Sequence, residues 1–203
     1  MNIDSLTYAS NIKNLKKIKK NKNYYFKKID ITNKKKVKKI INNFKPNYIV
    51  HLAAETHVDR SINNPNKFIK TNILGTYNLL SESYFFWKNL TNNKKKHFKF
   101  LHVSTDEVYG DLYKKRKLFN ENTKYDPSSP YSATKASSDH LVRAWFRTYS
   151  LPVFISHCSN NYGPYQYPEK LIPLLIKRAM ENKKIPVYGK GLQIRDWLYV
   201  DDH

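Results

Sequence analysis

Cysteine and glycine are both scarce in this chain of 203 residues, which contains one cysteine and five glycines. A single cysteine cannot form a disulfide within the chain, so the class of small secreted proteins held together by disulfides is excluded. Cys158 lies in an apolar stretch, which favours a small buried side chain over a reactive thiol. We therefore expect a cytoplasmic protein whose thiol stays reduced.

Long apolar runs are missing as well. No run approaches the roughly 20 residues that a membrane-spanning helix needs, and the first residues lack the basic and then apolar pattern of a signal peptide. An apolar fraction of 40% and an aromatic fraction of 14% are nevertheless typical of a folded core. The sequence thus predicts a globular protein without a membrane partner.

Acidic residues are the third deficit, since 16 Asp and Glu against 37 Lys and Arg give a formal net charge of +21. Such a charge is typical of proteins that bind nucleic acids or membrane surfaces. Many of the lysines, however, lie in stretches rich in Asn, Lys and Ile, without a nucleic-acid-binding module, at residues 14–28, 33–39 and 92–96. A drift of exposed positions toward Lys and Asn explains them more simply, so no nucleic acid partner is expected. The basic surface would still attract an anionic substrate.

The pattern that is present alternates β-strands and α-helices, which is typical of a doubly wound α/β fold with a parallel sheet. The predicted strands cover residues 24–31, 48–54, 98–104 and 152–159, and the predicted helices cover 33–44, 65–80, 130–149 and 171–182. The run Tyr48–Ala54 is apolar throughout, as expected of a strand that is buried on both faces.

Capping residues mark where the helices begin. Thr32 precedes the first predicted helix, Asn64 and Pro65 open the second, and Ser129 and Pro130 open the third. A hydroxyl or amide side chain at this place accepts a hydrogen bond from the first helical turn, and proline there loses no helical hydrogen bond.

The most specific chemical signal is Tyr131, followed four residues later by Lys135 within a predicted helix. Residues four apart lie on one face of a helix. A free phenol has a pKa of about 10, and a neighbouring ammonium is expected to lower this pKa toward neutrality. Tyr131 could then take a proton from a sugar hydroxyl. Alone, the same spacing also fits an ordinary pair on a helix surface.

Polar residues follow the strand predicted at 98–104, in the order Ser104, Thr105, Asp106 and Glu107. The carboxyl ends of parallel strands face the ligand crevice of a doubly wound sheet. Two adjacent carboxylates at this place favour acid–base chemistry, and a solvated loop is the alternative. The tyrosine–lysine pair further along the chain favours the catalytic interpretation.

Five segments, in the same order, resemble the dTDP-glucose 4,6-dehydratases, a group within the extended short-chain dehydrogenase/reductase family. They are His51–Ser61, Ser104–Asp111, Pro127–His140, Cys158–Pro164 and Gly191–Val200. The Thr-Asp-Glu sequence at 105–107 distinguishes this group from the related epimerases, which are similar in the tyrosine–lysine pair. The resemblance implies a Rossmann-like fold, NAD as the cofactor and dTDP-glucose as the substrate.

The resemblance also implies a role for each catalytic residue. Tyr131 would remove the proton of the 4-hydroxyl while a hydride leaves C4 for NAD, Thr105 would hydrogen-bond the same oxygen, and Lys135 would hold the nicotinamide ribose. Glu107 would then remove the C5 proton, and Asp106 would protonate the departing 6-hydroxyl. Return of the hydride to C6 would give dTDP-4-dehydro-6-deoxy-glucose for deoxysugars of surface polysaccharide.

Further positions match those that bind cofactor or substrate in this group. The expected cofactor contacts, besides the tyrosine–lysine pair, are Asp4, Thr7, Asp30, Ile31, Leu52, Ala53, Ala54, Thr71 and Asn161. The expected substrate contacts are Thr56, Thr105, Asn160, Lys170, Leu171, Pro186, Tyr188 and Arg195. The guanidinium of Arg195 suits a pyrophosphate, and an ion pair with Asp196 is the structural alternative. The histidines show no metal-ligand spacing, so no metal is expected.

One part of the group's pattern has no match in this sequence, namely a first strand with a glycine-rich turn that holds the cofactor pyrophosphate. The resemblance begins at Asn2–Tyr8, which is similar to the end of the group's second strand. We expect a partial NAD-binding Rossmann domain at residues 1–165 and the start of a substrate-binding region at 166–203. We also expect the strands at 24–31 and 48–54 to be separated from the strand at 98–104, and the chain alone neither to bind NAD tightly nor to turn over substrate.

Three functional classes stay open: a dehydratase, a sister sugar-nucleotide epimerase or decarboxylase, and a non-catalytic remnant or basic binding module. The helices near 65–87 and 130–149 carry more large apolar side chains than the sheet can cover, including Trp145, Phe146 and Tyr149. The resembling proteins pair these helices across a two-fold axis, so a homodimer is expected.

Overall fold

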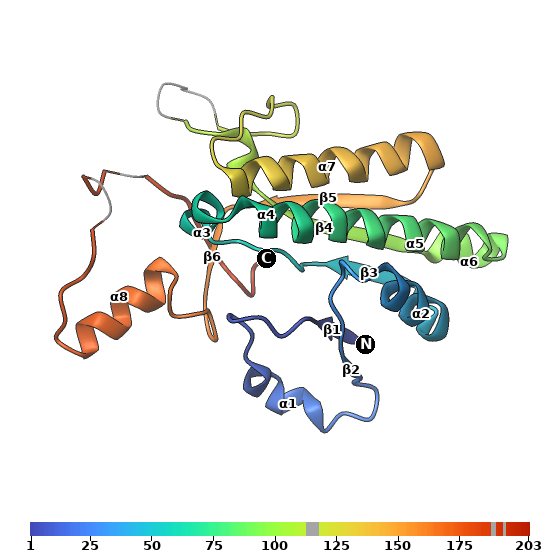
Figure 1. Cartoon of the computed structure of the whole chain (residues 1–203), viewed down its shortest axis with the longest axis horizontal. Helices are drawn as coiled ribbons and strands as arrows, with labels where there is room; N and C mark the ends of the chain where they lie inside the picture. Colours follow the sequence, from blue (N-terminus) through green and yellow to red (C-terminus); the bar gives the residue numbers. More distant parts are fainter. Residues whose placement is uncertain (113–117, 188–189, 193) are drawn as a thin grey trace.

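The computed structural model describes residues 1–112, 118–187, 190–192 and 194–203. Its strands form three sheets: β1 (Asn2–Asp4) with β2 (Phe26–Lys28), then β3 (Tyr48–His51), β4 (Lys99–Thr105) and β5 (Val153–Cys158), and finally β6 (Asn160–Tyr162) with β7 (Trp197–Tyr199). All of the strand pairings are parallel. The predicted parallel α/β architecture is thereby confirmed (Figure 1).

Strand β3 differs from the prediction in length, burial and pairing. It ends at His51, and the side chains of Tyr48 and Val50 are 66% and 56% exposed rather than buried, because a cavity lies beside the strand. The predicted separation from the strand at 98–104 is also wrong, since β3 pairs directly with β4, with Tyr48 opposite Lys99. Among the described residues, β1 and β2 form a two-stranded sheet of their own, apart from β3.

Helix α2 (Lys34–Phe44) begins at a different cap from the predicted one. Asn33, rather than Thr32, accepts the hydrogen bond from the backbone N–H of Lys36, at 3.0 Å. The Thr32 hydroxyl instead donates to the carboxylate of Asp30 at 2.8 Å. An amide oxygen one residue further along the chain therefore replaces the predicted hydroxyl as the cap.

A nearly continuous helical segment follows β3 and consists of α3 (Val58–Asn63), α4 (Pro65–Phe68), the π-helical stretch η2 (Ile69–Gly75) and α5 (Thr76–Lys88). Proline begins α4, as predicted, but the side chain of the predicted cap Asn64 makes no capping hydrogen bond, and the π-helical stretch was not predicted. Gly75 lies where this segment packs on Ile31, and a Cβ there would come within 2.5 Å of the isoleucine side chain. The glycine therefore permits the close packing of this helix.

Helix α7 (Pro130–Tyr149) begins at the predicted residues and lies beside α5 (Figure 1). Its N-terminus is fixed by a capping box in which Ser129 and Ser132 exchange side-chain to backbone hydrogen bonds. The main core joins these helices to α2 and the sheets through Ile31, Val37, Ile41, Leu79, Leu80, Phe98, Phe100, Val142 and Leu151. This packing fixes α7, which carries Tyr131 and Lys135, against β4, which ends at Thr105 just before Asp106 and Glu107.

The remaining elements are η1 (Ile12–Leu15), α1 (Lys16–Lys19), α6 (Asn92–His97), η3 (Asp106–Tyr109) and α8 (Leu171–Met180). Helix α8 extends away from the sheets in Figure 1. Its Pro173 stands in the first turn, where the N–H that proline lacks has no helical partner. None of the described helices is long and apolar enough to cross a membrane.

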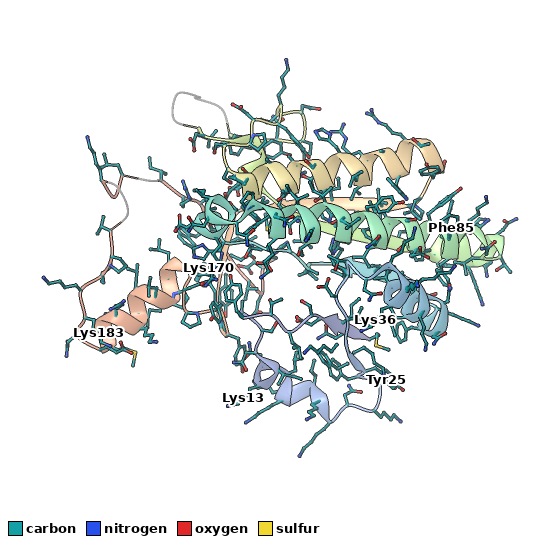
Figure 2. The ribbon with its side chains drawn as sticks, in the orientation of Figure 1. Lys13, Tyr25, Lys36, Phe85, Lys170 and Lys183 are labelled. Carbon is teal, nitrogen blue, oxygen red and sulfur yellow. The ribbon has the colours of Figure 1, made fainter. Side chains whose placement is uncertain are left out.

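The basic side chains are spread over the surface. Lys13, Lys36 and Lys183 are exposed and lie on separate parts of the molecule (Figure 2). This distribution agrees with a solvated lysine-rich surface and does not single out one basic patch.

Candidate active site

The carboxyl end of β4 places three polar candidates at one edge of the sheet. Thr105 is the last residue of β4, and Asp106 and Glu107 begin the turn η3. The Thr105 hydroxyl donates to the Asp106 carboxylate and accepts from the Glu107 backbone N–H, both at 3.3 Å. Gly110 ends the turn with a φ of 77°, where a Cβ would lie 2.4 Å from the carbonyl oxygen of Asp126. The turn thus keeps both carboxylates beside the end of the strand.

Helix α7 brings the tyrosine–lysine pair to the same place. Tyr131 and Lys135 are buried, with exposed fractions of 8% and 4%. The ammonium of Lys135 donates to the backbone carbonyl of Val103 in β4, at 2.8 Å. The charges of Asp106 and Glu107 are close enough to act on the Tyr131 hydroxyl. The structure therefore brings together all five predicted catalytic residues.

The pKa of Tyr131 moves in the opposite direction to the prediction. Burial raises the pKa of this hydroxyl well above its ordinary value, the charge of Glu107 raises it further, and the Thr105 hydroxyl offsets only a part. The Lys135 ammonium donates to the β4 carbonyl of Val103, and burial lowers the pKa of Lys135 itself to about 8. Tyr131 is therefore protonated at neutral pH in this structure.

Burial also raises the pKa of both carboxyl groups. The charge of Asp106 raises the pKa of Glu107 further, whereas the charge of Arg195 lowers the pKa of both groups. The hydroxyl of Thr105 lowers the pKa of Asp106, whereas the charge of Lys170 lowers that of Glu107. Two adjacent carboxyl groups in different surroundings can serve as one acid and one base.

Some of the predicted substrate contacts lie near these carboxyl groups. The charges of Lys170 and Arg195 both lower the pKa of Glu107, which places these cations around it. The ammonium of Lys170 also donates to the backbone carbonyl of Thr56, at 3.2 Å, and thus joins the segment before α8 to the loop after β3. Cations at this position suit an anionic substrate.

Other predicted substrate contacts are less closely gathered. The Asn160 side chain donates to the carbonyl of Asp196 at 3.4 Å, and both Leu171 and Pro186 are exposed. The Arg195 guanidinium donates to the carbonyl of its neighbour in the chain, and within the described residues it forms no ion pair with Asp196. Tyr188 lies outside the described residues.

A cavity of about 740 Å³ separates β1 from β3 and collects most of the predicted cofactor contacts. Its lining includes Asp4, Thr7, Asp30, Ile31, Leu52, Ala53, Ala54 and Thr71. The volume lies within the range of about 300–1,000 Å³ that is usual for small-molecule sites. Tyr131, Lys135 and Asn161 do not line this cavity, and Asn161 instead hydrogen-bonds to the backbone of Ser159 at 3.0 Å. Most of the predicted cofactor contacts therefore line this cavity, whereas Tyr131, Lys135 and Asn161 lie outside its lining.

Sequence reasoning missed a buried polar cluster beneath the site. Asp139, which is completely buried in α7, accepts hydrogen bonds from the Ser104 hydroxyl at 2.8 Å and the Tyr125 hydroxyl at 3.1 Å. Its carboxylate also lies 3.0 Å from His157 Nε2 and 3.2 Å from His102 Nε2. Burial raises the pKa of Asp139, but the two histidines and the serine outweigh this effect and hold the pKa well below its ordinary value.

The cluster explains how α7 is held on the sheet. Asp139 follows Lys135 by four residues and Tyr131 by eight, so all three share one helix face, which is the signal that could have revealed it. Its partners come from β4, β5 and the loop before α7. Asp139 therefore positions the tyrosine–lysine pair against the strand end. In the described part of the chain, no group of three or more His, Cys, Asp or Glu residues is arranged to hold a metal ion.

We predict that Asp139→Asn lowers the free energy of unfolding by about 3–5 kcal/mol, because it removes a buried charge and replaces one of the two acceptor oxygens by an N–H donor that faces other donors. The lowered folded-state pKa means that this stabilisation is present above about pH 4 and is lost as the pH falls below it. Denaturant unfolding at pH 7 and at pH 3 measures both effects. Asp202→Asn, at an exposed position, is the matched control. Equal stabilities of the two variants at pH 7 would contradict the assigned role.

Comparison with known proteins adds the decisive observation. The family model described as GDP-mannose 4,6 dehydratase matches residues 1–203. The chain belongs to this family. The dTDP-glucose 4,6-dehydratase of Neisseria meningitidis serogroup B is 53% identical over 203 residues, which are 100% of this chain and 57% of that relative.

Solved structures of similar proteins agree with this membership. The dTDP-glucose 4,6-dehydratase of Streptomyces venezuelae, a double mutant with NAD bound, is 40% identical with a TM-score of 0.89 over 99% of this chain and 58% of that one. The enzyme of the same name from Bacillus anthracis, in complex with NAD, is 47% identical with a TM-score of 0.84 over 100% of this chain and 59% of that one. These likenesses confirm the predicted Rossmann-like fold class. This family member spans less than two thirds of the length of the relatives that it matches.

Proposed function

We propose that the protein to which this chain belongs removes water from dTDP-glucose to give dTDP-4-dehydro-6-deoxy-glucose, in the synthesis of deoxysugars for surface polysaccharide. The observation that carries the proposal is the meeting of Asp106 and Glu107, at the end of β4, with Tyr131 and Lys135 of α7. A tyrosine–lysine pair alone serves oxidation and reduction of a hydroxyl. The removal of water also requires an acid and a base beside this pair.

NAD is the cofactor that we propose, and the residues present fit it. The carboxylates of Asp4 and Asp30 stand near the ends of neighbouring parallel strands at the main cavity, where a ribose is commonly bound. The small side chains of Ala53 and Ala54 allow a dinucleotide to lie close to the backbone of the loop after β3. When bound, NAD would supply the acceptor for a hydride from C4 of the sugar and the donor for its return to C6.

Residues of this chain carry out the proton transfers. Tyr131 takes the proton of the 4-hydroxyl, with Thr105 as a hydrogen-bond partner of the same oxygen and Lys135 as the residue that holds the nicotinamide ribose. Because the pKa of Tyr131 is raised, a nearby positive charge would help this phenol to lose its proton, and an oxidised nicotinamide ring would supply such a charge. The first proton transfer is therefore expected to depend on a bound, oxidised cofactor.

The carboxyl groups serve the elimination. Once C4 is a ketone, the C5 proton is acidic enough for Glu107, whose raised pKa makes it a stronger base than an ordinary carboxylate. Asp106, whose pKa is also raised, keeps a proton more readily and delivers it to the departing 6-hydroxyl. We propose that Arg195, Lys170, Thr56 and Asn160, with Leu171, Pro186 and Tyr188, bind the substrate, and that Asn161 contacts the cofactor.

The test uses an extended protein, in which the chain is joined to the segments of the Neisseria meningitidis relative that lie outside the matched region. With dTDP-glucose, the extended protein should form a 4-keto sugar nucleotide whose absorbance appears in alkali. An epimerase would leave no 4-keto product, and a remnant would leave the substrate unchanged. Either of these results would overturn the proposal. The same assay on the 203-residue chain tests the expectation that it is inactive alone.

We also propose that residues 1–165 belong to the cofactor-binding domain and 166–203 to the substrate-binding region, and that the protein is cytoplasmic. The position of α8 away from the three-stranded sheet supports the division (Figure 1). The single reduced cysteine and a nucleotide-sugar substrate support the location.

An aromatic face on α5 and α7 supports a homodimer. It consists of Tyr77, Phe85, Phe146 and Tyr149, all of which are exposed on neighbouring helices. An exposed cluster of large apolar side chains on one face is typical of a protein–protein interface. We propose that two copies pair through this aromatic face across a two-fold axis.

We predict that the extended protein sediments as a dimer at micromolar concentration. Phe146→Glu should weaken the dimer by about tenfold or more, because it places a charge in an apolar interface. Phe44→Glu, which changes an exposed phenylalanine on α2, should leave the dimer intact. A monomer of the unmodified extended protein at micromolar concentration would refute the homodimer.

A further inference from the structure

One carboxylate, that of Glu169, joins three parts of the chain that lie far apart in sequence. It accepts a hydrogen bond from the Tyr8 hydroxyl at 2.9 Å and another from the Arg60 guanidinium at 3.2 Å. Nε2 of His57 lies 4.0 Å from the same carboxylate. Glu169 belongs to the turn before α8, Tyr8 follows β1, and the other two residues belong to α3 and its N-terminal cap. The carboxylate therefore holds the turn before α8 against two separate anchors.

Tyr8 is contacted from three directions. The Cζ atom of Arg60 lies 3.9 Å from the centroid of its ring, and the Tyr167 ring meets it nearly at a right angle, with centroids 5.8 Å apart. Burial, followed by the hydrogen bond to Glu169, raises the pKa of the Tyr8 hydroxyl to about 12. This hydroxyl is therefore protonated near neutral pH and donates to the carboxylate. We call Tyr8, Arg60 and Glu169 the carboxylate clamp.

Both anchors of the carboxylate clamp are themselves held in place. Oδ1 of Asp4 accepts hydrogen bonds from the Leu6 backbone N–H at 2.6 Å and from the Ser10 hydroxyl at 2.9 Å, and so folds the segment that carries Tyr8. Helix α3, which carries Arg60, packs against α7. The carboxylate clamp thus connects the turn before α8 with the helix that bears the tyrosine–lysine pair.

The residue after Glu169 faces the candidate active site. The Lys170 ammonium donates to the carbonyl of Thr56, and its charge acts on Glu107. A lysine side chain is a long flexible stem, so the place of its charge depends on how its backbone is held. An isolated ion pair at a surface contributes little to stability. Here several contacts converge on one carboxylate directly beside Lys170, which indicates a role in placing that residue.

We propose that Glu169 is a positioning residue, which acts through Lys170 and holds its ammonium where it binds the diphosphate of the nucleotide-sugar substrate. The inference rests on the proposed function, from which the substrate is taken. Lysine binds a phosphate as a point charge, so the benefit depends on the distance between the two charges. The carboxylate clamp sets this distance because it fixes the backbone at the neighbouring residue. Glu169 itself needs no contact with the substrate.

The test measures the affinity of the extended protein for dTDP by titration calorimetry. Glu169→Ala should weaken binding by about tenfold, because the Lys170 ammonium is no longer held at the diphosphate. Tyr8→Phe removes one donor and keeps the ring beside Arg60, so it should weaken binding by about threefold. This smaller change tests the carboxylate clamp even where Glu169→Ala fails to fold. Glu181→Ala and Tyr25→Phe, which make the same changes at exposed positions, should leave the affinity unchanged.

A double-mutant cycle with Lys170→Ala separates positioning from a merely structural role. Once Lys170 is alanine, Glu169→Ala and Tyr8→Phe should each change the affinity for dTDP by less than about twofold. Full effects of both variants in that background would overturn the proposal, as would unchanged affinity in both single variants. An extended protein that binds dTDP but leaves dTDP-glucose unchanged would contradict the proposed function alone. Failure of the unmodified extended protein to bind dTDP would overturn both.

Discussion

The Glu107→Gln variant of the extended protein should accumulate reduced cofactor when it is mixed with dTDP-glucose. The variant keeps Tyr131, so the hydride can still leave C4, but an amide cannot remove the C5 proton. Loss of a positioned base typically slows its step by about 10²–10⁴-fold. The oxidised sugar would then remain bound to the enzyme together with the reduced cofactor. Absorbance at the reduced-nicotinamide band, followed by stopped flow, measures this accumulation.

Glu121→Gln is the control for that experiment, because it makes the same chemical change at an exposed position in the loop before α7. This control variant should turn over like the unmodified extended protein, without a build-up of reduced cofactor. Normal turnover by the Glu107→Gln variant would show that another group removes the C5 proton.

The Tyr131→Phe variant should be blocked at the first hydride transfer, one step before the elimination. Removal of the phenol leaves no group to take the proton of the 4-hydroxyl, so the first hydride transfer itself should slow by about 10²–10⁴-fold. Little reduced cofactor should then appear, in contrast to the Glu107→Gln variant. Since Phe fills the same buried space, the free energy of unfolding should change little. Stopped-flow absorbance and denaturant unfolding together separate the chemical effect from a structural one.

Tyr165→Phe, at an exposed tyrosine, provides the matched control. If the Tyr131→Phe variant reduced the cofactor as fast as this control, the proton of the 4-hydroxyl would have to go elsewhere. Thr105 and Lys135 would then be the groups to test next.

Local patterns in the sequence predicted much of the fold and much of the candidate site. The four-residue spacing of Tyr131 and Lys135 fixes them on one helix face, and the turn after β4 follows directly from an apolar run that ends in polar residues. Capping by Ser129 and a proline at the first helical position fixed where α7 begins. These features depend on neighbours in the chain, so they can be recognised without a structure.

Features that depend on distant residues could not be recognised in the same way. The pKa of Tyr131 rises because the side chain is buried, and burial results from packing of the whole helix on the sheet. The Asp139 cluster gathers side chains from β4, β5 and a loop, none of which are neighbours in sequence. The exposure of Val50 likewise reflects the cavity beside β3 rather than the apolar run itself.

The most direct test of the central claim follows the hydride. The extended protein is given dTDP-glucose that carries deuterium at C4, and the product is analysed by nuclear magnetic resonance and mass spectrometry. Oxidation at C4 followed by return of the same hydride predicts deuterium at C6 of a 4-keto, 6-deoxy product. Deuterium that stays at C4 of an epimerised sugar, or a 6-deoxy product without deuterium at C6, would contradict the account.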